Sequence, residues 1–77
     1  MRQLFVAPAE TGRRVRLWRE RYGWSQRDLA TRAGLSHRTV LKVEKGYGVT
    51  VATLEAVAGA LGASADDLLG PRRKARL

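Results

Sequence analysis

The apolar residues of the chain recur at helical spacing in two long blocks. Residues three or four positions apart share one face of a helix. The first block consists of Thr11, Val15, Trp18 and Tyr22. The second consists of Val51, Leu54, Val57, Ala58 and Leu61. The pattern therefore predicts two amphipathic helices, with these residues facing a common core.

Between these blocks, capping residues divide residues 25–46 into two shorter helices. Ser25 is an N-cap candidate, and Asp28, three residues later, resembles the partner in a capping box. Gly34 permits a tight turn, and Ser36 can cap the next helix. The residues expected to face the core are Leu29, Ala30, Ala33, Leu35, Val40 and Val43. Two helices joined by a turn of three or four residues predict a helix-turn-helix.

The remaining loops and caps complete a set of five helices. Residues 46–48, "GYG", form a predicted loop, and Thr50 can cap the fourth helix, which Gly62 ends. Ser64 can cap a short fifth helix over "ADDLL" at 65–69. Five short helices with short connections predict a single all-α domain.

The chain divides into three predicted parts. Residues 1–8 form an N-terminal arm, in which Leu4-Phe5-Val6 is either a short strand or an apolar plug. Residues 9–70 form the helical domain. Residues 71–77 form a basic C-terminal tail, "PRRKARL", whose run of charges predicts disorder.

Composition limits how the domain can be stabilised. The 77 residues include no cysteine, so neither a disulfide nor a thiolate metal site is available. A chain of this size needs a compact apolar core, and a partner subunit could add to it. The apolar run near the start is too short to span a membrane or to form a signal-peptide core. We expect a cytoplasmic protein that does not bind membranes.

The positive charge is unevenly distributed. The net charge is +8, and residues 1–48 carry +7 of it. Residues 49–70 carry −3, and the tail carries +4. A basic field concentrated on one part of a domain is typical of nucleic-acid-binding proteins, although a solubilising surface is the simpler alternative.

The second helix of the predicted helix-turn-helix is more polar than a core helix needs to be. Its outward residues are His37, Arg38, Leu41, Lys42 and Lys45. Residues spaced by four lie on the same face of a helix, so 37, 41 and 45 share one face and 38 and 42 share another. A basic, hydrogen-bonding surface one helix wide fits the major groove of DNA.

Catalytic and metal chemistry find little support in the sequence. His37 is the only histidine, and its neighbour Ser36 would point in a different direction on a helix, so a nucleophile–base pair is not expected. The loop "GYG" lacks the lysine and the spacing of a phosphate-binding loop. We expect no enzymatic activity, no metal and no cofactor.

The segment "SQRDLATRAGLSHRTVLKVEKG", followed by "TVATLEAVAGALGASADDLL", resembles the Cro/C1-type helix-turn-helix domain of the XRE family. The resemblance covers about residues 9–69. It implies a five-helix, lambda-repressor-like DNA-binding domain whose second and third helices form the helix-turn-helix. It also implies a homodimeric transcriptional regulator. The loop "GYGVT" is short and lacks the extra basic residues that some members have.

The resemblance also implies roles for individual residues. Gln26 matches a position that contacts phosphate, and His37, Arg38 and Lys42 match positions that read base edges. Arg19 and Glu44 match a salt bridge between the first and third helices, and the place of Glu44 beside a core valine favours a partly buried pair.

We therefore expect a sequence-specific regulator, in the form of a dimeric repressor, that reads the major groove of a palindromic double-stranded operator with residues 36–45. Arg27 and Lys45 are further phosphate candidates, and Leu41 could meet a thymine methyl group. Tyr47 could contact a phosphate or cap the core. The full predicted set is Gln26, Arg27, Ser36, His37, Arg38, Thr39, Leu41, Lys42, Lys45 and Tyr47.

Two questions about partners stay open at this point. The dimer surface is expected near Leu68 and Leu69 and on the apolar arm at residues 4–6. The alternative function is an antitoxin-like or adaptor module, in which DNA binding serves autoregulation. In that case the N-terminal arm or the C-terminal tail would hold a protein partner.

Overall fold

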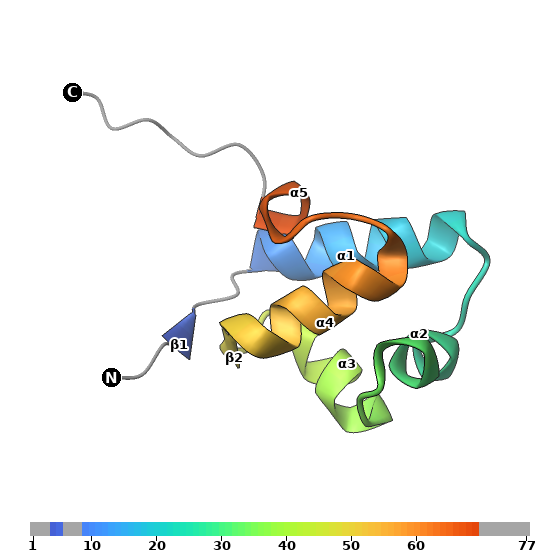
Figure 1. The fold of residues 1–77 in the computed structure, drawn as a ribbon, viewed down its shortest axis with the longest axis horizontal. Helices are drawn as coiled ribbons and strands as arrows, with labels where there is room; N and C mark the ends of the chain where they lie inside the picture. Colours follow the sequence, from blue (N-terminus) through green and yellow to red (C-terminus); the bar gives the residue numbers. More distant parts are fainter. Residues whose placement is uncertain (1–3, 6–8, 70–77) are drawn as a thin grey trace.

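The computed structural model describes residues 4–5 and 9–69, and in this part of the chain five helices surround one core (Figure 1). The helices are α1 (Ala9–Arg21), α2 (Gln26–Ala33), α3 (His37–Glu44), α4 (Val51–Leu61) and α5 (Ala65–Leu69). The five predicted helices are confirmed.

A short antiparallel sheet accompanies the helices. Strand β1 (Leu4–Phe5) pairs with β2 (Val49–Thr50), with Leu4 opposite Thr50 and Phe5 opposite Val49. For Leu4 and Phe5 the strand alternative is therefore correct, while Val6 lies outside the described residues. The sequence pattern does not predict β2, because two residues are too few to show an alternation.

The predicted caps hold the helix ends on both sides of the turn between α2 and α3. The Ser25 side chain accepts a hydrogen bond from the Asp28 N–H, and the Asp28 carboxylate accepts one from the Ser25 N–H, which completes the capping box. Ser36 caps α3, and Gly34 ends α2 in the left-handed conformation with φ 71°. The caps Thr50, Gly62 and Ser64 are also present. Each side-chain cap stabilises its helix by about 1 kcal/mol.

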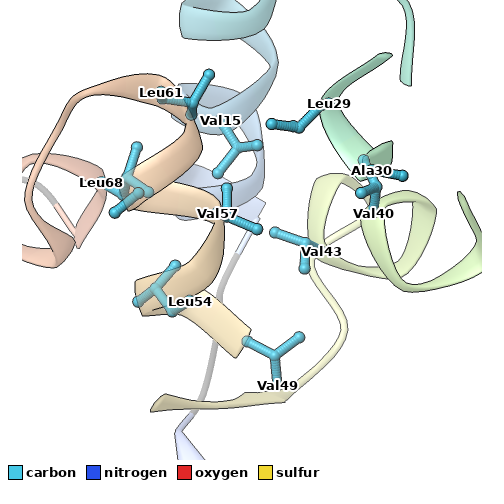
Figure 2. Close-up of a cluster of buried hydrophobic side chains, with 11 residues drawn as sticks. Val15, Leu29, Ala30, Val40, Val43, Val49, Leu54, Val57, Leu61 and Leu68 are labelled. Atoms are coloured by element: carbon cyan, nitrogen blue, oxygen red, sulfur yellow. The ribbon is translucent and has the colours of Figure 1, made fainter. Parts of the chain in front are cut away.

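All five helices contribute to the core, and β2 adds Val49 to it (Figure 2). Val57 of α4 lies between Val15 of α1 and Val43 of α3 in this view. Trp18 and Trp24 are partly buried against the cluster, as expected for core residues rather than base-stacking platforms. The cluster consists of Val15, Leu29, Ala30, Val40, Val43, Val49, Leu54, Val57, Ala58, Leu61 and Leu68.

The predictions for three of the inward residues are wrong. Val51 is 41% exposed because it is the first residue of α4 and lies at the edge of the core. Tyr22 follows the last residue of α1 and is 48% exposed. Its ring instead stacks on Trp24 with 4.4 Å between centroids, and its hydroxyl donates to the Leu61 carbonyl at 2.6 Å. Ala33, at the end of α2, is only half-buried.

The dimer surface expected near Leu68 and Leu69 stays a prediction, but the Leu68 side chain belongs to the core and not to that surface. Leu68 is completely buried inside its own domain, where α5 packs against α1 and α4. Its side chain is already packed against other residues of the same domain, so it is not available for contact with a second copy of the chain. Leu69 is partly buried against the same core.

One close approach of two backbones sets the position of α3, and the sequence pattern does not predict it. A Cβ atom at Gly12 of α1 would lie 2.5 Å from the carbonyl oxygens of both Val43 and Glu44. Only glycine therefore allows α1 to cross the end of α3 at this distance. A glycine inside an otherwise helical pattern is the signal that could have indicated the crossing.

We expect Gly12→Ala to lower the free energy of unfolding by about 1–3 kcal/mol, because the clash involves backbone atoms that cannot rotate away. The matched control is Gly59→Ala in α4, where an added Cβ meets nothing within 4 Å. That change should raise the free energy of unfolding by about 0.5–1 kcal/mol, because alanine is the better helix former. Urea denaturation of the three proteins measures both effects. Equal midpoints for the two variants would contradict the proposed role of Gly12.

Candidate nucleic-acid interface

Helices α2 and α3 form a helix-turn-helix at one edge of the domain. The turn is closed by a hydrogen bond from the Leu35 N–H to the Ala30 carbonyl at 2.8 Å. Leu29 and Ala30 of α2, together with Val40 and Val43 of α3, are buried in the core. In Figure 1, α3 lies at the lower edge of the molecule and α5 at the upper edge. The core side of both helices is thus occupied, and their outer sides face solvent.

Arg32 of α2 is an exposed cation that lies over the Trp24 ring, 4.2 Å from its centroid. The other exposed cations on α2, on α3 and directly after α3 are Arg27, Arg38, Lys42 and Lys45. Within residues 9–69 none of them forms an ion pair, whereas three arginines of α1 are paired with acids. The positive charge of this surface is therefore not neutralised within the described part of the domain, as expected of a surface that binds a polyanion.

Arg19 and Glu44 form an ion pair between α1 and α3. The Arg19 Nε and the Glu44 Oε2 are 2.6 Å apart, and the Arg19 Nη2 is 3.0 Å from the Oε1. The two side chains are only 11% and 5% exposed. The third nitrogen, Nη1, donates to the Trp24 carbonyl at 2.8 Å. This bidentate ion pair holds the end of α3 against α1.

The charge state of the pair follows from these contacts. The hydrogen bond to the Glu44 carboxylate raises the pKa of Arg19 above its ordinary value, against the opposing effect of burial. The guanidinium therefore stays charged at every pH at which the protein would be studied. Because the carboxylate accepts two hydrogen bonds from this cation, it acts as an acceptor toward its other neighbours.

Gln26 extends this ion pair toward the outer surface of α3. Its Nε2 donates to the Glu44 Oε1 at 3.0 Å, and its Oε1 lies 3.1 Å from the His37 Nε2. The amide keeps one N–H and one lone pair for a further partner. The phosphate contact of Gln26 stays a prediction, and the structure shows in addition that Gln26 bridges α2 and α3.

The other predicted contact residues take different positions. The Ser36 hydroxyl accepts from the Thr39 N–H at 3.1 Å and lies 2.9 Å from the Thr39 hydroxyl, so it is engaged as a helix cap. Thr39 and Leu41 are half-buried. Tyr47, in the loop after α3, is 55% exposed and therefore does not cap the core.

Within the part of the chain that the structure describes, no three histidine, cysteine or acidic side chains come together as a metal site would require. In the same residues, no helix has the length and apolar character needed to cross a membrane.

Comparison with known proteins agrees with this geometry. A family model described as "Helix-turn-helix" matches residues 15–68. A Neisseria hypothetical transcription factor from Neisseria meningitidis serogroup B is 41% identical over 58 residues, which cover 74% of this chain and 55% of the relative. The chain thus spans about half the length of that curated relative. These matches show that the chain belongs to the Cro/C1-type, or XRE, helix-turn-helix family.

Solved structures of similar fold confirm the lambda-repressor-like architecture. The restriction-modification controller protein C.AhdI from Aeromonas hydrophila is 33% identical, with a TM-score of 0.74 over 78% of this chain and 92% of its own. The hypothetical transcription factor NHTF from Neisseria is 39% identical, with a TM-score of 0.76 over 82% and 74%. SinR, a master regulator for biofilm formation solved in complex with DNA, is 28% identical, with a TM-score of 0.71 over 77% and 97%.

We expect Glu44→Ala to lower the free energy of unfolding by on the order of 3 kcal/mol, because it leaves the Arg19 charge partly buried without its partner. The matched control is Glu20→Ala. This change breaks an exposed ion pair, in which the Arg16 side chain is 61% exposed and the Glu20 side chain 51%. The decrease there should be below about 0.5 kcal/mol. Chemical denaturation measures the two decreases, and a small one for Glu44→Ala would show that the buried pair adds little stability.

Proposed function

We propose that the chain is a sequence-specific, double-stranded-DNA-binding transcriptional regulator without catalytic activity. The observation that carries this proposal is the exposed face of the helix-turn-helix, with four unpaired cations on or directly after two helices whose inner faces are held by the core. The likeness to SinR, which was solved in complex with DNA, supports the same function.

The proposed interface divides into positioning and reading contacts. Arg27, Lys45 and the second N–H of Gln26 would bind phosphates, which supply affinity without reading sequence. The residues that would face base edges from the first two turns of α3 are His37, Arg38, Leu41 and Lys42. Tyr47, exposed in the following loop, would be a further phosphate contact.

The proposal extends to a dimeric repressor on a two-fold operator. Two copies of α3 would then enter successive major grooves about 34 Å apart. The alternative of an antitoxin-like or adaptor module depends on residues 1–8 and 71–77, of which the structure describes only the β1 backbone. That alternative stays a prediction.

We expect Arg38→Ala to reduce binding to a selected operator far more than binding to random DNA. A guanidinium that bonds both O6 and N7 of guanine is worth about 1–3 kcal/mol against the wrong base. Lys45→Ala should weaken both by a similar factor, and it should reduce the slope of log affinity against log salt by about 1 for each phosphate that is no longer neutralised. The measurement is affinity for operator and random duplexes across a salt series. An unchanged operator-to-random ratio in Arg38→Ala would assign the reading role to another residue of α3.

We expect sedimentation velocity to detect a dimer, at high concentration or on the operator, because a two-fold site needs two recognition helices. Deleting residues 1–7 removes β1 and tests whether the arm contributes to association. A monomer both free and on DNA would contradict the dimer. Unchanged association after the deletion would place the dimer surface elsewhere on the domain.

A further inference from the structure

A chain of hydrogen bonds runs from α1 to the first residue of α3, and each link determines the orientation of the next. Glu44, held by Arg19, can only accept. The Gln26 amide must therefore turn its NH₂ group toward the carboxylate, where Nε2 and Oε1 are 3.0 Å apart. In the reversed orientation the amide oxygen would face the Glu44 oxygen, and two acceptors would repel each other. The Gln26 carbonyl oxygen is left to face His37.

The same logic determines where the proton of His37 lies. Its Nε2 is 3.1 Å from the Gln26 Oε1, and a carbonyl oxygen can only accept. The Nε2 must then carry the hydrogen, and in a neutral imidazole the Nδ1 is left with a free lone pair. Within residues 9–69, no side chain or backbone group makes a hydrogen bond to that Nδ1. His37 thus has one nitrogen committed to the protein and one available to a ligand.

We propose that the Nδ1 of neutral His37 acts as a hydrogen-bond acceptor in the major groove and selects a base that presents an amino group, adenine N6 or cytosine N4. This inference rests on the proposed function. The other polar atoms at major-groove edges, guanine O6 and N7, adenine N7 and thymine O4, are acceptors and would repel a lone pair. The specificity of His37 is therefore set by the tautomer and not only by its position on α3.

Gln26 is the positioning residue in this arrangement. A free imidazole exchanges its proton between the two nitrogens and can present either a donor or an acceptor. The Gln26 carbonyl removes that choice, because only the tautomer with hydrogen on Nε2 satisfies it. Removal of the Gln26 amide should not move His37 away from its position on α3. His37 should then discriminate only weakly between bases that present a hydrogen-bond donor and bases that present an acceptor.

The first test reads the tautomer in the free protein. Because His37 is the only histidine, long-range ¹H–¹⁵N spectra of its ring are unambiguous. At about pH 8, where an ordinary imidazole is neutral, we expect the proton on Nε2. Gln26→Leu should shift the ring signals toward a mixture of tautomers. The control Arg27→Ala changes the neighbouring residue of α2, which is exposed, and should leave these signals unchanged.

The second test reads the base. In vitro selection gives the operator, and the base pair whose preference disappears in His37→Ala lies under His37. The adenine or cytosine there is then replaced by the analogue in which only the amino group is missing. The same amino group also makes a Watson–Crick hydrogen bond, so the loss is compared with that of His37→Ala on the same two duplexes. We expect binding of the unsubstituted protein to fall about tenfold more than binding of His37→Ala, as for removal of one hydrogen bond. In Gln26→Leu the difference between the two duplexes should shrink, whereas Arg27→Ala should weaken binding to both and keep their ratio.

Each result has a defined consequence. A wild-type ring protonated on Nδ1, or equal losses for the unsubstituted protein and for His37→Ala on the duplex without the amino group, would overturn the assignment of the tautomer while the proposed function stands. If selection yields no preferred duplex, both the proposed function and this inference fail, although the ring spectra still report whether Gln26 orients His37.

Discussion

The buried ion pair between Arg19 and Glu44 is the constraint on which the geometry of the interface depends. It joins α1 to the end of α3, and beside it the backbones of the two helices approach so closely that only glycine fits at position 12. The hydrophobic core alone would hold α3 less specifically, because apolar packing is not directional. A charged pair with two hydrogen bonds has one favourable geometry, and it therefore sets how α3 is presented to solvent.

The ion pair also organises the polar side chains around it. Gln26 donates to Glu44, and its carbonyl oxygen lies 3.1 Å from the His37 Nε2. Partly buried polar groups need partners, and here each partner is itself oriented by the next. The contacts of the ion pair thus extend through Gln26 to the first residue of α3. Stability and the proposed recognition of DNA therefore depend on the same set of contacts.

The cations of the helices differ in whether they are paired. Arg14, Arg16 and Arg19 of α1 are paired with acids, whereas Arg27, Arg38, Lys42 and Lys45 are exposed and form no ion pair within residues 9–69. An unneutralised group of cations on one surface attracts phosphates over several ångströms and weakens with salt. Thr39 and Leu41 of α3 are half-buried, and in the proposed complex they would make short-range packing contacts with the DNA.

The sequence by itself determined the five helices, their caps and most of the core, because helical periodicity and capping chemistry are local properties. It also indicated the polar face of α3 and, through the family motif, the pairing of Arg19 with Glu44. Only the tertiary structure decided the β1–β2 pairing, the burial of Leu68 and the exposure of Val51, since each depends on which distant element covers a residue. The same is true of Gly12 and of the link from Gln26 to His37. Contacts between elements far apart in the chain leave no periodic signal, and their distances decide both the helix crossing and which side chain the His37 ring contacts.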